Sequence, residues 1–237
     1  MAGHSKWANI KHKKAKEDAK RGKEFTKLIK EITIAARSGG DITGNPRLRQ
    51  LVDKAKKINM PQENITRAIK KGTGELPGVS YEHIVYEGHG PAGSAIIIEV
   101  LTDNKNRAVA DMRHIFSKYS GNLAETGSVN WMFEKLGVIR SKAPQLSEEE
   151  LFEKLLDQDI QDISIQDDIL TITTPVTSLA HVTEAVKNIN ITVDDSEIEW
   201  IAKTPMSITA EHEEKAFKLL EALEDHDDVQ NVYTNLA

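Results

Sequence analysis

The first third of the chain has an apolar residue at every third or fourth position, the spacing of helices that bury one face. This spacing predicts a helix of about four turns over residues 25–36, which Ser38-Gly39-Gly40 ends. Asn45-Pro46 predicts a second helix, because Asn caps helices and Pro fits the first helical position. Pro61 predicts a third. Helices this short are stable only when packed together, so residues 1–78 are expected to form a helical domain.

After residue 78 the pattern changes to short β-like runs that alternate with amphipathic helices. Tyr81–Tyr86 and Ser94–Leu101 are expected to be strands joined by a Gly/Pro turn, and a helix should follow the cap region at Asp103-Asn104. Further strands are expected at residues 128–133, 137–140, 160–165, 169–173, within 191–201 and near 229–233, with helices carrying Leu151, Val182 and Leu220.

The last helix and strand cannot form a core by themselves. The strand-strand-helix-strand set that begins at residue 79 lacks a partner of this kind. We therefore expect residues 79–140 plus 205–237 to form a second domain, with residues 141–204 inserted in it as a third. The predicted class is α+β, a helical domain followed by two small sandwiches of the ferredoxin-like kind.

Charge divides the chain in a way that its net value of −6 conceals. Residues 1–71 hold 14 Lys and 5 Arg against 7 acidic residues, a formal charge of +12. The remainder holds 12 basic and 30 acidic residues, which gives −18. Such asymmetry suggests that one end of the protein contacts nucleic acid or a membrane surface.

Several classes of protein are disfavoured by composition. The chain has no cysteine, which excludes disulfides, thiolate metal sites and cysteine nucleophiles. Its longest apolar run, Ala95-Ile96-Ile97-Ile98, is far shorter than the roughly 18 residues typical of a membrane span. No secretory signal is recognisable, and we expect a cytoplasmic protein without a membrane partner. A monomer is slightly favoured, although nothing in the sequence fixes the oligomeric state.

No catalytic, metal or cofactor site is predicted, and the chain is not expected to be an enzyme. Gly88-His89-Gly90-Pro91-Ala92-Gly93 has the spacing of a dinucleotide-binding loop, but a strand rather than a helix should follow it, so a hairpin turn is the better interpretation. None of the eight histidines has a metal-ligand spacing. No cofactor is therefore expected.

The strongest functional signal is a run of basic residues near the N-terminus, interleaved with two aromatic rings. Lysines neutralise phosphates and release counterions, and an exposed tryptophan can stack on an unpaired base. The alternatives are a solvated helix face or an arm that lies against the acidic remainder of the molecule. The predicted nucleic-acid-binding residues are Lys6, Trp7, Lys11, His12, Lys13, Lys14, Lys16, Lys20, Arg21, Lys23 and Lys27.

A second group of basic residues could extend this surface or could be an ordinary polar helix face. The expected secondary contacts are Arg47, Arg49, Lys56, Lys57, Lys105 and Arg107. The last two lie in Asp103-Asn104-Lys105-Asn106-Arg107, which either caps a helix or presents a loop to RNA or a protein partner.

Five stretches of the sequence resemble the YebC family: Met1 to Lys14, Tyr86–Gly93, Thr102–Arg107, Gly127–Trp131 and Asp228–Asn235. This family includes bacterial proteins described as probable transcriptional regulators and the mitochondrial translational activator of cytochrome c oxidase subunit I. The resemblance implies three domains, with the third inserted in the second, and gene-expression control without a known catalytic site.

The resulting hypothesis is a nucleic-acid-binding regulator of gene expression, a DNA-binding transcriptional regulator of the YebC type. The rival is a ribosome-associated translation factor that binds ribosomal RNA and relieves stalling, for example at proline-rich stretches. Phosphate binding would look alike in both kinds of protein. No helix shows Asn, Gln or Arg spaced to read base edges, and this absence slightly favours recognition of RNA or of nucleic-acid shape.

Replacing Lys11, Lys13 and Lys14 with Glu is expected to abolish most nucleic-acid binding and to flatten its salt dependence, because three phosphate contacts become repulsive. A titration at several salt concentrations measures both quantities. Unchanged affinity and slope would remove this run from the interface.

Overall fold

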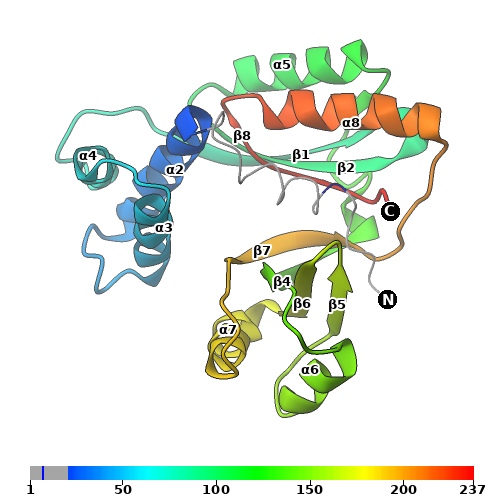
Figure 1. Cartoon of the computed structure of the whole chain (residues 1–237). Helices are drawn as coiled ribbons and strands as arrows, with labels where there is room; N and C mark the ends of the chain where they lie inside the picture. Colours follow the sequence, from blue (N-terminus) through cyan, green and yellow to red (C-terminus); the bar gives the residue numbers. More distant parts are fainter. Residues whose placement is uncertain (1–6, 8–20) are drawn as a thin grey trace.

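The computed structural model describes Trp7 and residues 21–237. A group of three helices, α2 to α4, stands at one side of a four-stranded sheet, and a second four-stranded sheet lies beneath the first (Figure 1). The helices α5 and α8 cover the first sheet on the face turned away from the second sheet, whereas α6 and α7 pack on the second (Figure 1).

The helical domain consists of α2 (Arg21–Ala35), α3 (Pro46–Lys57) and α4 (Gln62–Gly72). The side chain of Asn45 caps α3 by accepting a hydrogen bond from the Leu48 amide at 3.1 Å, and Pro46 occupies the first helical position as predicted. The apolar stripes of the three helices meet in one buried core, to which Ile32, Val52 and Ile65 contribute fully buried side chains.

The first sheet has the order β3-β1-β2-β8 and is antiparallel throughout. Its strands are β1 (Glu82–His89), β2 (Ala95–Thr102), β3 (Asn122–Ala124) and β8 (Val229–Thr234). Ile96, Ile98 and Val100 of β2 point to the face that α5 (Lys105–Lys118) and α8 (Ala210–Glu224) cover. The turn between β1 and β2 contains Gly90 and Gly93 of the predicted hairpin, whereas Gly88 lies within β1, and a strand follows the turn rather than a helix.

The second sheet has the order β5-β6-β4-β7. It is formed by β4 (Phe133–Lys142), β5 (Asp162–Gln166), β6 (Ile169–Pro175) and β7 (Asp195–Ala202), with α6 (Glu148–Lys154) and α7 (Leu179–Asn188) packed on one face. The turn between β5 and β6 holds Asp167 and Asp168 at φ of 53° and 63°, the pair of positive values that a tight two-residue hairpin requires. The Ser147 capping box begins α6 as its sequence predicts.

The chain leaves the first sheet after β3, builds the whole second sheet, and returns through α8 to place β8 beside β2. The α+β class, the helical N-terminal domain and the insertion are confirmed. The expected boundary at residue 140 falls within β4, which pairs with β7 from Phe133 to Arg140 and with β6 from Leu136 to Lys142. The strand at residues 137–140 therefore belongs to the inserted sheet and not to the second domain as predicted. The prediction was wrong because these residues follow β3 closely in sequence.

The face of the first sheet opposite α5 and α8 forms a second apolar layer, in which Ile97 and Tyr233 pack with Phe133 and Ala202 from the inserted sheet. Within the described part of the chain, no helix is both long and apolar enough to cross a membrane.

Candidate functional site

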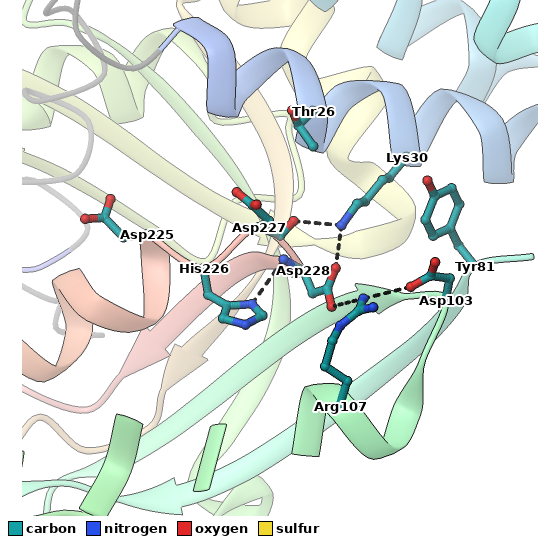
Figure 2. A pocket seen from close by; sticks show the side chains of 9 residues that line it. All are labelled: Thr26, Lys30, Tyr81, Asp103, Arg107, Asp225, His226, Asp227 and Asp228. Carbon is teal, nitrogen blue, oxygen red and sulfur yellow. Dashed lines mark hydrogen bonds and ion pairs between the residues drawn. The ribbon is translucent and has the colours of Figure 1, made fainter. Parts of the chain in front are cut away.

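The helical domain docks on the first sheet at a polar junction that lines a cavity of about 520 Å³ (Figure 2). Helix α2 contributes Thr26 and Lys30, the start of α5 contributes Asp103 and Arg107, and Tyr81 comes from the segment before β1. The turn between α8 and β8 completes the lining with Asp225, His226, Asp227 and Asp228.

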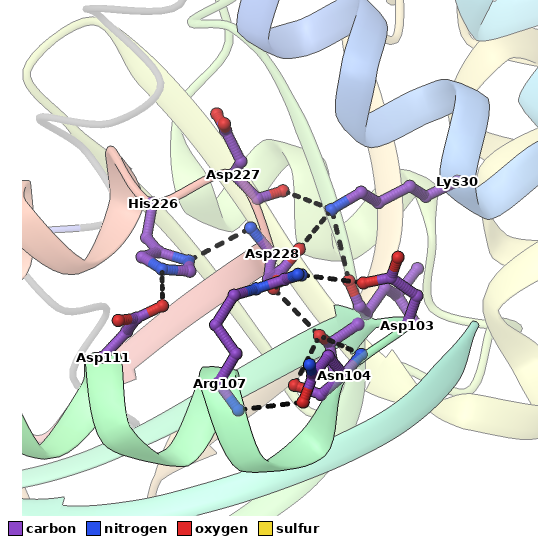
Figure 3. A network of polar contacts seen from close by, with 10 residues as sticks. Lys30, Asp103, Asn104, Arg107, Asp111, His226, Asp227 and Asp228 are labelled. Atoms are coloured by element: carbon purple, nitrogen blue, oxygen red, sulfur yellow. Dashed lines mark hydrogen bonds and ion pairs between the residues drawn. The ribbon is translucent and has the colours of Figure 1, made fainter. Parts of the chain in front are cut away.

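The carboxylate of Asp228 is the centre of this junction (Figure 3). It is buried, and it accepts hydrogen bonds from Lys30 Nζ at 2.6 Å, Thr102 Oγ1 at 2.9 Å and Arg107 at 3.1 Å. Burial alone would raise the pKa of Asp228, but these hydrogen bonds outweigh it and hold the pKa below its usual value. The backbone carbonyl of Asp228 also accepts from the Leu101 amide at 2.7 Å, so both the side chain and the main chain tie the turn to β2.

Lys30 carries the contact from the helical domain. Its side chain is buried, and Nζ donates to the Asp227 carbonyl at 2.8 Å and to the Leu101 carbonyl at 3.4 Å in addition to Asp228. The three donor positions of the ammonium are thus directed at three acceptors from two segments of the chain. A buried ammonium is tolerable only with such complete pairing.

His226 shapes the turn that holds Asp228. Its Nδ1 accepts a hydrogen bond from the Asp228 amide at 3.1 Å, so Nε2 carries the proton and can donate to Asp111 of α5 at 3.2 Å (Figure 3). The histidine therefore bridges α5 and the turn. This role differs from a metal ligand or a phosphate contact.

The segment Asp103–Arg107 begins α5 and closes the other side of the cavity. Asn104 caps the helix by accepting from the Arg107 amide at 3.0 Å, and the Arg107 guanidinium pairs with Asp103 at 2.7 Å and with Asp228. Of the two interpretations of residues 103–107, helix capping is therefore the role that Asn104 has. Arg107 points into the junction, whereas Lys105 is exposed.

Four aspartates and two cations surround the cavity, which makes it unfavourable for a phosphate group. Among the described residues, no three His, Asp or Glu side chains are grouped so that they could hold a metal ion. The chemistry of the junction is that of a structural joint between two domains.

A second polar cluster lies where α2 and α3 meet β7 of the inserted sheet. Lys54 of α3 forms an ion pair with Glu197, and Arg140 forms a two-pronged pair with Glu199 on the same strand. Burial and the nearby charge of Glu197 raise the pKa of Asp195 to about 6. Burial likewise raises the pKa of Glu31 on α2. The helical domain is therefore held by ion pairs to both sheets.

Most of the predicted nucleic-acid-binding residues lie outside the described part of the chain: Lys6, Lys11, His12, Lys13, Lys14, Lys16 and Lys20. Arg21 begins α2, and only its backbone is described. Lys23 pairs with Asp225 at 3.1 Å, and Lys27 lies 3.5 Å from the Glu224 carboxylate. Together with Lys30 they form a stripe along α2 that faces the acidic turn. Lys23 and Lys27 therefore match the alternative prediction, in which the basic segment lies against the acidic remainder of the molecule.

Trp7 requires a correction. The sequence suggested a flat face open to an unpaired base, but only 4% of this residue is exposed. Its ring stacks on Phe217 of α8 with centroids 5.9 Å apart, within the core of the first sheet. The apolar area of the indole is large enough that burial against α8 outweighs the exposure that stacking on a base would need.

The secondary residues fall into two groups. Arg47 pairs with Glu31 at 2.9 Å, Arg49 donates to the Thr43 carbonyl at 3.0 Å, and Arg107 lies in the junction. Lys56, Lys57 and Lys105 are exposed. The structure thus brings Lys56 and Lys57 to the C-terminal end of α3, away from Lys105 and Arg107 at the start of α5.

The sequence reasoning missed the central residues of the junction, Lys30 and Asp228. A signal for them was present, because Lys23, Lys27 and Lys30 are spaced four and three residues apart on one helix face. Residues 224–228 carry four acids close to the C-terminus. The pairing of two such segments nearly 200 residues apart has no local signature.

Comparison with known proteins places these features in a wider group. Residues 5–75 match the model of the TACO1/YebC protein N-terminal domain, and residues 81–236 match that of the TACO1/YebC second and third domain. A probable transcriptional regulatory protein of Persephonella marina is 53% identical over 99% of this chain and 95% of its own length. One from Syntrophomonas wolfei is 50% identical over 100% and 96%. A crystal structure of a conserved hypothetical protein from Aquifex aeolicus, 43% identical, superposes with a TM-score of 0.85 over 94% of this chain and 93% of that one.

Replacing Lys30 with Met is expected to lower the free energy of unfolding by about 3 kcal/mol, because Asp228 and two carbonyls lose a buried partner. The matched control is Lys23→Met, which removes the exposed pair with Asp225 on the same helix and should change stability by less than about 1 kcal/mol. Urea denaturation of both variants measures the difference. Equal effects would show that the junction adds no more than a surface ion pair.

Replacing Asp195 with Asn is expected to raise the stability at pH 7.5 by about 1–2 kcal/mol. A carboxyl whose pKa is raised in the folded state takes up a proton on folding between its unfolded pKa near 4 and about 6, so its charge costs stability above pH 6. The advantage of the variant should shrink as the pH falls through this window and vanish near pH 4. Urea denaturation of the wild type and of Asp195→Asn between pH 4 and 7.5 measures this trend.

Proposed function

The chain belongs to the TACO1/YebC family, and from this premise we propose that it is a non-enzymatic, nucleic-acid-binding regulator of gene expression that acts as a transcriptional regulator. The helical domain, together with the basic run that precedes it, would hold the phosphate backbone. The two acidic sheet domains would position the helical domain and, by repelling phosphates, would restrict contact with nucleic acid to one side of the molecule.

The observation that carries this proposal is the distribution of exposed lysines on the helical domain. Lys56 and Lys57 end α3, and Lys70 and Lys71 end α4. All four are exposed, and none forms an ion pair with another described residue. The lysines of α2 differ, because the acidic turn at residues 224–228 already neutralises them. Among the described residues of this domain, the exposed lysines without an ion pair therefore lie on α3 and α4.

The arginines of this domain support contact with phosphates rather than base reading. Of the arginines whose side chains are described, Arg47 and Arg67 are paired with Glu31 and Glu63, Arg49 donates to a backbone carbonyl, and Arg37 donates to the Ser80 hydroxyl. Base-specific readout in the DNA major groove relies on side chains that are free to form bidentate contacts with base edges. This feature gives weight to the rival, a ribosome-associated translation factor that binds RNA through shape and phosphates and relieves stalling, for example at proline-rich stretches.

The test is the double variant Lys56→Glu/Lys57→Glu, compared with Lys142→Glu/Lys154→Glu, two exposed lysines of the inserted domain with the same change of charge. We expect the first variant to bind duplex DNA or ribosomal RNA more weakly and to lower the slope of log K against log salt by about 1–2, because each phosphate contact contributes about 0.7–0.9. The control should keep the wild-type slope. Equal losses in both variants would indicate a general charge effect and contradict the proposed face.

The same titrations separate the two functions. Preference for particular promoter duplexes supports the transcriptional regulator. Preference for ribosomal RNA or intact ribosomes at moderate salt supports the translation factor, with the helical domain as the binding surface in either case.

A further inference from the structure

Among the described residues, Trp131 is the most exposed large apolar side chain apart from Leu156, with 66% of its surface open. The other two tryptophans are covered: Trp7 lies in a core, and Trp200 is half-buried beneath Lys135, whose ammonium is 4.7 Å from its ring. Trp131 lies in the segment between β3 and β4, where the chain passes from the first sheet to the inserted one.

The loop that carries Trp131 is shaped by a buried carboxylate. Glu87 of β1 is only 2% exposed, and its two oxygens accept hydrogen bonds from the amides of Gly127, Val129 and Asn130 at 2.7–2.9 Å. Burial would raise the pKa of Glu87, but these three amides outweigh it and lower the pKa, so the group stays ionised at neutral pH. Gly127 adopts a φ of 94°, a conformation that favours glycine.

The ring itself is held in one orientation. Trp131 Nε1 donates to the Ser128 carbonyl at 3.0 Å, and Lys203 Nζ donates to the Trp131 carbonyl at 2.9 Å. On either side of Trp131 in sequence, Val129 and Phe133 are buried in the apolar layer between the sheets. No aromatic ring or cation of the described residues lies over the Trp131 face.

We propose that Trp131 is a stacking platform for an unpaired base of a single-stranded nucleic acid, with the exposed ammonium of Lys203 placed for the adjoining phosphate. This inference rests on the proposed function and names its partner. The sequence reasoning gave a stacking role to Trp7, which is buried, and the structure assigns it to Trp131. A fixed, open π-face with a neighbouring cation is the arrangement that binds bases without reading their edges.

A nucleic-acid base fits this surface better than a protein anchor does. Aromatic anchors of protein interfaces lie within an apolar patch that excludes water. The exposed positions near Trp131 in sequence carry no large apolar side chain, namely Glu125, Thr126, Gly127, Glu134 and Lys135, and Lys203 reaches its carbonyl from a distant segment.

The test measures the binding of a single-stranded oligonucleotide of about 12 nucleotides, as RNA and as DNA, and of the matching duplex. Trp131→Ala is expected to weaken single-strand binding by about 5- to 150-fold, since a stacked base contributes about 1–3 kcal/mol. Trp131→Phe should restore most of it, and duplex binding should change little. The control Leu156→Ala, at another highly exposed apolar residue, should bind as the wild type does.

Fluorescence gives a second readout. Stacking should quench the emission of Trp131, so the quenching seen on wild-type protein should be absent from Trp131→Phe. Glu87→Gln, with a neutral amide in place of the carboxylate, should weaken single-strand binding although the ring remains, provided that circular dichroism shows a folded protein.

The outcomes separate this inference from the proposed function. Wild-type protein that binds single strands while Trp131→Ala retains full affinity and quenching would overturn the inference and leave the proposed function intact. Wild-type protein that binds neither single strands nor duplex would overturn both. The RNA and DNA arms show which kind of single strand the platform accepts.

Discussion

The ion pair between Lys30 and Asp228 joins the segments on which the arrangement of the whole molecule depends. Lys30 belongs to the helical domain, and Asp228 immediately precedes β8, the strand that completes the first sheet after the insertion. The pair is buried and surrounded by Thr102, Arg107 and His226, so it is satisfied only when helix, sheet and returning chain are all in place. Because an unpaired buried charge is costly, the junction selects one placement of the helical domain over others.

The same constraint decides which positive charges remain available to a ligand. The α2 stripe is directed at the acidic turn, and Lys54 at Glu197 of the inserted sheet. These lysines hold the domains together. The exposed lysines at the ends of α3 and α4 are left to face outward, so an acidic protein can still present a basic surface. A count of charge along the chain cannot distinguish these two uses of lysine.

Local signals in the sequence predicted what is local in the structure. The Asn45 cap, the Ser147 capping box and the hairpin between β1 and β2 each depend on a few adjacent residues, and each forms as expected. The insertion was also predictable, because α8 and β8 needed a partner. The position of β4 was not, since an apolar strand can pair with either sheet. The burial of Trp7 and the exposure of Trp131 depend on contacts with Phe217 and Glu87 that are distant in sequence.

Nucleic acid is expected to contact the outward lysines of the helical domain and not the lysines of the junction. Crosslinking of the protein to nucleic acid in cells, followed by mass spectrometry of the linked peptides and sequencing of the attached DNA and RNA, tests it directly. The linked peptides should contain Lys56, Lys57, Lys70 or Lys71, with Lys30 unmodified. Linked peptides confined to α6 and α7 of the inserted domain would contradict it.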